Sequence, residues 1–253
     1  MRYGIQLYSL RQYLKSDEDY REVFKRCNEM GAETVQLSVT AGHPYNAELI
    51  KELVKESGLS VCSTHSPFSR IVNDLDNLAL EHLSFDCHEI GIGMMPGEYR
   101  KNHYEKLDDF IAELNRAAER LKQYNISVAY HNHWFEWDDT KEGKVIERLI
   151  NNTSKDVNFI PDTFWIKFAG EEPIEFLKKV SGRVQTLHLK DYKKTLGLPI
   201  FRAVGKGILD FKEIIKTAED IGVQNSVVEL DLSPKPYMSL EFSFDYINKN
   251  LKS

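Results

Sequence analysis

Cysteine is scarce in this 253-residue sequence, and the three that occur exclude a disulfide framework. Cys27, Cys62 and Cys87 lie far apart and form no CxxC pair. An odd number of cysteines without paired spacings is typical of reduced, buried thiols. None of the three lies at the strand ends described below that carry the polar residues of interest, which argues against a structural zinc site there.

The sequence also lacks an excess of positive charge and any long apolar run. Its 33 Lys and Arg residues are outnumbered by 39 Asp and Glu residues, which gives a net charge of −6. A nucleic-acid partner is therefore disfavoured, since phosphate binding needs a basic face. No segment approaches the roughly 18 apolar residues of a membrane span, and the opening MRYGIQLYSLRQYL has no signal-peptide core. We expect a soluble, cytoplasmic protein with no membrane partner.

A glycine-rich GxGxxG turn is absent after the first expected strand, so an open doubly wound sheet lacks its usual signature. Short apolar runs instead alternate with longer amphipathic segments. The expected strands are 3–8, 33–38, 59–65, 91–95, 126–131, 157–162, 183–190 and 226–230, and the expected helices are 17–30, 47–57, 74–90, 104–124, 143–151, 173–180, 211–221 and 240–251. Eight strand–helix units without a break in composition predict an α/β fold, a single (β/α)8 barrel domain over residues 1–253. Residues 191–210 are expected to be a long irregular loop.

Polar residues stand at the ends of several of these strands. Strand five ends in Tyr130-His131-Asn132-His133, and strand six ends in Asp162. Strand seven contains His188, strand eight carries Glu229 and Asp231, and strand three ends at His65. In a parallel barrel these carboxyl ends meet at one mouth, where the loops after the strands converge. We therefore expect these side chains to face one another.

The residue types predict a divalent metal ion at that mouth. Asp162 and Glu229, with His188 between them and either Glu136 or His131 beside them, form a mixed oxygen and nitrogen set. Such a set suits Mn²⁺, Mg²⁺, Co²⁺ or Zn²⁺ and leaves positions open for substrate oxygens.

Structural roles compete with this interpretation. A carboxylate at a strand end is often the N-cap of the next helix, and His188 could be a satisfied histidine of the barrel interior. His131 and His133 alternate along an extended segment, so both cannot point into the predicted metal site if the strand continues. Asp191 is expected to hold the long loop. The histidines expected at the surface are His43, His82, His88 and His103, and the aromatics that either pack or stack on a sugar ring are Trp134, Phe135, Trp137, Phe164 and Trp165.

Five motifs together resemble the xylose isomerase-like barrel superfamily of sugar and sugar phosphate isomerases and epimerases. They are YHNHWFEW at 130–137, DTFW at 162–165, HLKD at 188–191, GKGILDF at 205–211 and VELD at 228–231. The resemblance spans essentially the whole chain, and the order and spacing of the motifs carry it. It does not specify a substrate.

This resemblance implies a metal held by Glu, Asp, His and Glu from strands five to eight. Asp162, His188 and Glu229 match the last three positions. At the first position this chain has His131, with Glu136 a few residues later; we take Glu136 as the ligand and His131 as close to substrate, with His131 as the alternative ligand. The resemblance also implies substrate contacts at Lys190, Arg202 and His65, and Trp165 belongs to the aromatic platform.

The implied reaction is proton removal beside the carbonyl of a sugar or cyclitol, with the metal as Lewis acid stabilising an enediolate. His131, His133, Glu136 or Glu229 could move the proton. The outcome could be an epimer, an isomer, or loss of a β-substituent in a dehydratase or 3-keto-glycoside lyase. Two other functions compete: a DNA-repair endonuclease, against which the acidic charge and few histidines count, and a sugar-binding barrel without turnover. A homo-oligomer is left open, with the segment 232–237 able to contribute.

Overall fold

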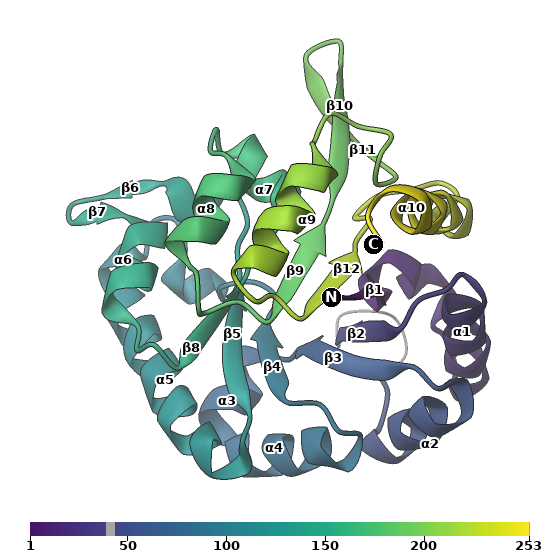
Figure 1. The fold of residues 1–253 in the computed structure, drawn as a ribbon. Coiled ribbons are helices and arrows are strands. Elements are labelled where there is room, and N and C mark those ends of the chain that lie inside the picture. The colour runs from purple at the N-terminus through teal and green to yellow at the C-terminus, as the bar shows by residue number, and fades with distance from the viewer. Residues whose placement is uncertain (39–43, 253) are drawn as a thin grey trace.

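Eight short parallel strands pair side by side in the computed structural model, which describes residues 1–38 and 44–252. The strands are β1 (Arg2–Gln6), β2 (Thr34–Ser38), β3 (Ser60–His65), β4 (Glu89–Ile92), β5 (Ser127–His131), β8 (Val157–Ile160), β9 (Thr186–Leu189) and β12 (Asn225–Val228). They follow the order β8-β5-β4-β3-β2-β1-β12-β9, so each strand lies beside its neighbours in the chain (Figure 1). Almost all their residues are buried, as expected for strands covered on both faces.

The sheet closes on itself between β8 and β9, its first and last strands. Among the described residues, two isolated parallel bridges join them, Phe159 with Val184 and Asp162 with His188. The Phe159 N–H donates to the carbonyl of Arg183 at 2.7 Å, and the His188 N–H donates to that of Pro161 at 2.9 Å. This seam completes the predicted (β/α)8 barrel and brings Asp162 beside His188.

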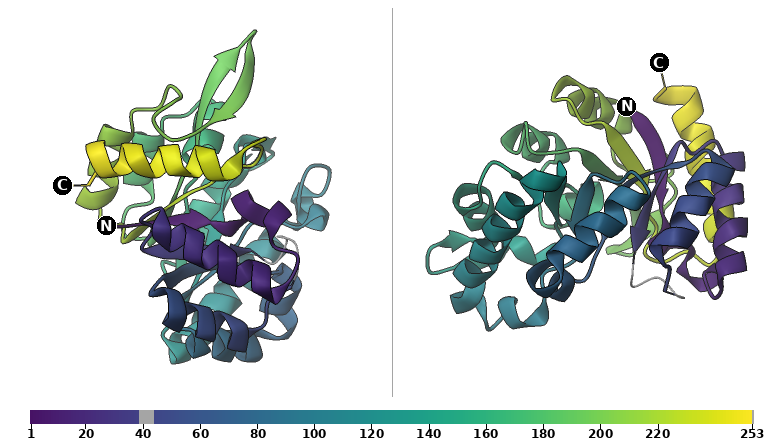
Figure 2. Two further views of the ribbon diagram at one scale, coloured as in Figure 1. Left: turned by 90° about the vertical axis from the view of Figure 1, so that its right-hand side faces the viewer. Right: turned by 90° about the horizontal axis from the view of Figure 1, so that it is seen from below.

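Helices surround the strands (Figures 1 and 2). They are α1 (Asp17–Glu29), α2 (Ala47–Ser57), α3 (Phe68–Asn73), α4 (Leu75–Ser84), α5 (Leu107–Leu121), α6 (Val145–Asn152), α7 (Thr163–Phe168), α8 (Pro173–Lys179), α9 (Phe211–Asp220) and α10 (Pro236–Asn250). In α5 the buried residues Leu107, Phe110, Ile111 and Leu114 recur at helical spacing and form the inward face. None of the helices among the described residues is long and apolar enough to cross a membrane.

The region around the fourth strand differs from the sequence prediction. The helix expected over 74–90 ends ten residues after it begins, at Ser84, and β4 occupies Glu89–Ile92 instead of 91–95. Asp86 turns the chain with a positive φ of 57°. Aspartate tolerates this conformation because its short side chain can bond locally. The sequence does not mark this helix end, because residues 84–89 (SFDCHE) contain neither glycine nor proline.

Residues 191–210, expected to be irregular, contain a β-hairpin. Its strands are β10 (Asp191–Thr195) and β11 (Leu198–Arg202), joined through Leu196 and Gly197, which both have positive φ. Two positive φ values in a two-residue turn define the type I′ geometry that suits hairpin twist. The hairpin projects away from the barrel (Figures 1 and 2). Further short elements are β6 (Asp139–Thr140), β7 (Gly143–Lys144), and the 3-10 helices η1 (Leu7–Tyr13), η2 (Gly97–Tyr99), η3 (Tyr104–Lys106), η4 (Lys122–Tyr124) and η5 (Phe135–Trp137).

Glu89, the first residue of β4, carries a carboxyl group inside the barrel. Its Oε1 accepts from the Asn158 amide on β8 at 3.4 Å, across the intervening β5, and its Oε2 has no partner. The side chain is fully buried, and burial raises the pKa of Glu89 to about 7. The carboxyl is therefore neutral in the folded protein at pH values where it is ionised in the unfolded chain.

We expect Glu89→Gln to stabilise the protein above pH 7 and to have no such effect near pH 4. The raised pKa of Glu89 lowers wild-type stability as the pH rises from about 4.5 to about 7, and this loss amounts to roughly 3 kcal/mol as an upper estimate. Urea unfolding across this pH range measures the difference. The exposed Glu241→Gln is the matched control and should follow wild type. Equal stability of Glu89→Gln and wild type at pH 8 would contradict this account.

Candidate metal centre

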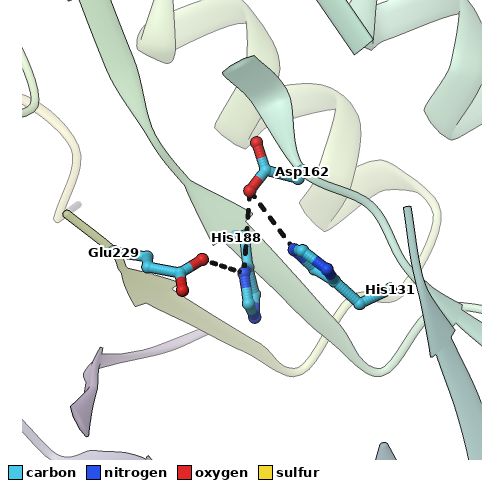
Figure 3. Close-up of side chains that lie close together, drawn as sticks. All are labelled: His131, Asp162, His188 and Glu229. Atoms are coloured by element: carbon cyan, nitrogen blue, oxygen red, sulfur yellow. Dashed lines mark hydrogen bonds and ion pairs between the residues drawn. The ribbon is translucent and has the colours of Figure 1, made fainter. Parts of the chain in front are cut away.

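Four side chains converge at the carboxyl ends of β5, β8, β9 and β12. His131, Asp162, His188 and Glu229 each offer one ligand atom, and these atoms all lie within 4.8 Å of one another (Figure 3). All four side chains are buried. The strand ends carry them to one point, as the barrel geometry predicts.

Hydrogen bonds behind the two histidines orient their rings. His131 Nδ1 lies 3.1 Å from the Gly93 carbonyl, so Nδ1 carries the proton and Nε2 faces Asp162 at 3.3 Å. His188 Nε2 lies 2.7 Å from Gln36 Oε1, which leaves Nδ1 facing Glu229 Oε2 at 2.8 Å. Donation of the rear nitrogen to an oxygen is the usual arrangement behind a metal-ligating histidine. Both rings can therefore present a nitrogen lone pair to the same ion.

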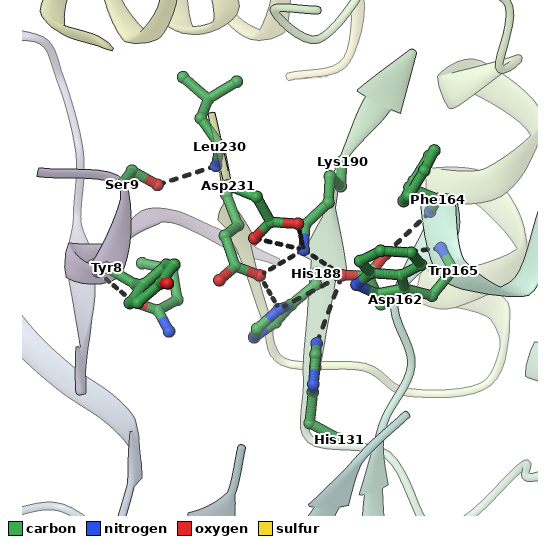
Figure 4. Close-up of polar contacts among 12 residues, drawn as sticks. Tyr8, Ser9, His131, Asp162, Phe164, Trp165, His188, Lys190, Leu230 and Asp231 are labelled. Carbon is green, nitrogen blue, oxygen red and sulfur yellow. Dashed lines mark hydrogen bonds and ion pairs between the residues drawn. The ribbon is translucent and has the colours of Figure 1, made fainter. Parts of the chain in front are cut away.

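The two carboxylate oxygens of Asp162 make different contacts. Its Oδ1 caps α7 by accepting from the backbone N–H groups of Phe164 at 2.9 Å and Trp165 at 3.0 Å. Its Oδ2 faces His131 and the ammonium of Lys190, which lies at 3.0 Å (Figure 4). The N-cap role, which was the structural alternative to metal ligation, is confirmed. It leaves the second oxygen of Asp162 directed toward His131 and Lys190 in the candidate metal centre.

Lys190 lies among the carboxylates and is only 1% exposed. Its Nζ is 3.0 Å from Asp162 Oδ2, Glu229 Oε2 and Asp231 Oδ2. Burial alone would raise the pKa values of Asp162 and Glu229, but Lys190 together with the His131 and His188 rings more than offsets this and holds both well below their ordinary values. Three carboxylates against one ammonium leave two negative charges, which a divalent ion would neutralise. The donor set of two nitrogens and two oxygens suits Zn²⁺, Mn²⁺ or Co²⁺.

Glu136, expected as the first ligand, is not in this group. The Tyr130 hydroxyl donates to its Oε1, and the His133 backbone N–H donates to its Oε2 at 2.8 Å. The side chain is fully buried in η5, and burial raises the pKa of Glu136 to about 7. The geometry therefore favours His131, the alternative left open by the sequence, because Glu136 points back to its own strand.

A pocket of about 540 Å³ opens beside the candidate metal centre, and two of the four candidate ligands, His131 and Glu229, line it. His65, His131, His133, Trp165, Lys190 and Glu229 line it, so most of the residues expected to contact substrate or move a proton face one space. Its lining also includes Trp134, Met94 and Phe68. Trp134 and Trp165 lie 4.9 Å apart and form an aromatic wall. This wall matches one of the two roles considered for these aromatics.

Arg202 lies elsewhere. It ends β11 opposite Asp191, its Nη1 is 3.4 Å from the carbonyl of Phe201, and it is not among the described residues that line the pocket. Contact between Arg202 and a substrate therefore stays a prediction.

Residues 24–238 match the family model of the xylose isomerase-like TIM barrel. The chain belongs to this family. The inosose dehydratase of Geobacillus thermodenitrificans is 27% identical over 147 residues, which are 51% of this chain and 49% of that protein. The match to the inosose dehydratase of Clostridium tetani is 27% over 156 residues, or 55% of this chain and 52% of that one. The chain thus spans about half the length of the curated relatives it matches.

Solved structures of this family resemble the whole chain. A sugar phosphate isomerase/epimerase from Parabacteroides distasonis has a TM-score of 0.80 at 23% identity and covers 97% of this chain and 93% of its own. A xylose isomerase-like TIM barrel protein from Mycobacterium smegmatis in complex with magnesium has a TM-score of 0.76 at 14% identity, with 99% and 96% covered. At these identities the likeness shows the fold alone.

Asp191 holds the loop of this xylose isomerase-like barrel, as expected. It accepts five backbone N–H groups, from Tyr192, Gly205, Gly207, Ile208 and Leu209. A Cβ on Gly207 would lie 2.0 Å from Asp191 Oδ1, so only glycine fits there. The GKG motif at 205–207 is therefore structural. It binds Asp191, the second residue after the end of β9 at Leu189.

The other histidines divide into buried and exposed. His82, expected at the surface, is 2% exposed and lies between Thr64 Oγ1 at 2.8 Å and the Leu78 carbonyl at 2.7 Å. That expectation was wrong, because the inward face of α4 carries this ring. His88 and His103 are exposed as expected, and His43 lies outside the described residues. The three cysteines are free and buried, as predicted.

Two residues of the site were not predicted from the sequence, and Asp231, the last residue of the VELD motif, was given no role. Gln36 orients His188, Gln6 Nε2 lies 3.2 Å from His65 Nδ1, and Asp231 pairs with Lys190. Gln6 and Gln36 stand inside the apolar runs YGIQLY and ETVQLS. The signal that found the other residues, a polar side chain within an apolar strand, would have found these two as well.

Two substitutions separate the candidates for the first ligand. We expect His131→Ala to reduce Mn²⁺ or Zn²⁺ affinity by at least about a hundredfold, since it removes a direct ligand. Glu136→Gln should keep one ion per chain at near wild-type affinity, because Glu136 faces Tyr130 and His133. Isothermal titration calorimetry on metal-stripped protein measures both. Loss of the ion in Glu136→Gln with retention in His131→Ala would reverse the assignment.

Proposed function

We propose that this chain is a divalent-metal-dependent isomerase or epimerase that removes a proton from the carbon beside the carbonyl of a sugar or cyclitol. The convergence of His131, Asp162, His188 and Glu229 beneath a pocket carries the proposal. A bound divalent ion would supply Lewis acidity toward adjacent substrate oxygens. The family and the sugar phosphate isomerase/epimerase neighbour support this class of reaction.

His133 suits the role of proton acceptor in this proposal. It lines the pocket, its Nδ1 is buried without a partner, and its ring is 5.5 Å from that of Trp165. Burial and the neighbouring His131 and Lys190 lower the pKa of His133 well below its ordinary value. The ring is therefore neutral near pH 7 and free to accept a proton.

Asp231 suits the role of the second group that handles the proton. It lines the pocket from the strand-eight side, and its carboxylate pairs with Lys190 at 3.0 Å. Burial raises the pKa of Asp231 to about 6, with Lys190 opposing this rise. A carboxyl that titrates near neutrality can both hold and release a proton. Lys190 Nζ also lies 5.5 Å from the centre of the Trp165 ring, within the range of a cation–π interaction.

A second reaction, dehydration, is favoured by the curated relatives, which are inosose dehydratases. It starts with the same proton removal and ends with loss of a β-hydroxyl rather than return of the proton. The same residues would serve, with Asp231 delivering a proton to the leaving oxygen. Mass spectrometry of the products separates the two, because only dehydration changes the mass.

Exchange of a substrate C–H for deuterium tests the proposal directly. In D₂O with Mn²⁺, we expect proton NMR to show loss of one signal beside the carbonyl of an inosose or a ketohexose. His133→Asn should slow this exchange by about a hundredfold or more, because asparagine cannot accept the proton. Metal content should be unchanged, and His88→Asn, at an exposed histidine, serves as the control. Absence of exchange with every keto-sugar and inosose tested would reject the proposed function.

A further inference from the structure

The chain leaves β1 through the 3-10 helix η1, whose geometry pairs Tyr8 with Arg11. Gln6 caps this helix, and its Oε1 accepts from the Tyr8 N–H at 2.5 Å. A 3-10 helix has three residues per turn, so side chains three positions apart lie one above the other. Leu7 and Leu10 form its buried side. On a different side, the guanidinium carbon of Arg11 lies 4.1 Å from the centre of the Tyr8 ring, within the range of a cation–π interaction.

Polar contacts fix η1 to the chain that follows β12, beside the candidate metal centre. Arg11 donates from Nη1 to the Tyr8 carbonyl at 2.8 Å and from Nη2 to the Asp231 carbonyl at 2.7 Å. The Ser9 hydroxyl accepts from the Leu230 N–H at 2.9 Å (Figure 4). The backbone of Tyr8 is therefore held at both its N–H and its carbonyl, and Arg11 also contacts its ring.

Tyr8 lies opposite His133 across the mouth of the barrel. In the ring of eight strands, β1 and β5 are four strands apart in either direction. Tyr8 is the second residue after β1, and His133 is the second residue after β5. Because segments that follow opposite strands face each other at the mouth, these two side chains line the same pocket from opposite walls. In Figure 4, Lys190 lies between Tyr8 and Trp165.

The hydroxyl of Tyr8 can meet a ligand in the pocket. Within residues 1–38 and 44–252, the hydrogen bonds of Tyr8 involve its backbone, and none involves its hydroxyl. The side chain is half-buried, lines the pocket and keeps its hydroxyl oxygen accessible. A phenolic hydroxyl both donates and accepts, so it can bind a carbonyl or a hydroxyl oxygen of a substrate. By contrast, the neighbouring Asp231 carboxylate is already paired with Lys190 at 3.0 Å.

We infer that Tyr8 is a substrate-binding residue and that Arg11 positions it. The Tyr8 hydroxyl donates to a substrate oxygen on the wall opposite His133, which turns the carbon that loses its proton toward the His133 ring. Holding a reacting carbon in line with its base removes a large part of the entropic barrier to proton transfer. This inference rests on the proposed function for the reaction and for the role of His133. It concerns binding rather than turnover, so the two can fail separately.

Tyr8→Phe tests the inference by calorimetry on the Mn²⁺-loaded protein, with an inosose and fructose as probes. The variant keeps the ring beside Arg11 and removes only the hydroxyl. Affinity for the probe that wild type binds should fall about tenfold, while Mn²⁺ affinity stays unchanged. Tyr13→Phe, on the same 3-10 helix but outside the pocket lining, is the matched control and should equal wild type. Equal probe affinity of Tyr8→Phe and wild type, weaker Mn²⁺ binding in Tyr8→Phe, or binding of neither probe to wild type would overturn the inference.

A double-mutant cycle tests the positioning role of Arg11. Arg11→Met should weaken probe binding about fivefold in the wild-type background and less than about twofold in Tyr8→Phe, because Arg11 then has no hydroxyl to position. The same loss in both backgrounds would mean that Arg11 acts on the fold alone, and the positioning role would be rejected.

The exchange experiment separates this inference from the proposed function. If wild type shows no deuterium exchange but Tyr8→Phe weakens probe binding, the proposed function fails and Tyr8 remains a binding residue. If wild type shows exchange but Tyr8→Phe binds the probe as wild type does, the inference fails and the proposed function stands.

Discussion

The arrangement of side chains at the mouth of this barrel depends on one ammonium buried among three carboxylates. Lys190 is held 3.0 Å from each of Asp162, Glu229 and Asp231, and all but Asp231 are almost fully buried. Each of these charges would be costly alone in such a place. The strands that carry them must therefore end in register, since a shift of one residue would turn the side chain to the opposite face.

Local contacts around β9 hold this register. The Thr163 hydroxyl, at the start of α7, donates to the carbonyls of His188 at 3.1 Å and Lys190 at 3.0 Å. It also accepts from the Lys190 N–H at 2.9 Å. On the other side, Asp191 gathers five backbone N–H groups of the following loop. The chain on either side of Lys190 is thus fixed by polar contacts, and the ammonium has little freedom to leave the carboxylates.

Much of this arrangement was predictable because the barrel converts sequence order into spatial order. Apolar strands with a polar residue at the carboxyl end identified Asp162, His188 and Glu229 without any coordinates. The choice between His131 and Glu136 was not predictable, because it depends on the direction of two side chains after the strand ends. In the structure the Tyr130 hydroxyl and the His133 N–H bind Glu136, which favours His131, and neither contact can be read from the sequence.

The fold was predicted as a whole, but some elements were not. The end of α4 was misplaced because Asp86 takes the positive φ usually given to glycine. The hairpin of β10 and β11 was read as a loop because its strands lie outside the barrel and lack the alternation of a half-buried sheet. Arg202 lies at the base of that hairpin, opposite Asp191, and its contact with substrate stays a prediction.

The candidate metal centre spans the seam between β8 and β9, so a bound ion would also affect the closure of the barrel. Two bridges close the ring of strands there, and one of them joins Asp162 to His188. Of the four ligands, His131 and Asp162 belong to the β5–β8 side of the seam, while His188 and Glu229 belong to the β9–β12 side. An ion held by all four would link the two sides of the barrel at the seam where the fewest bridges pair the strands. Ion binding would then also stabilise the closed barrel, because an ion that binds only the folded chain adds its binding free energy to the stability of the fold.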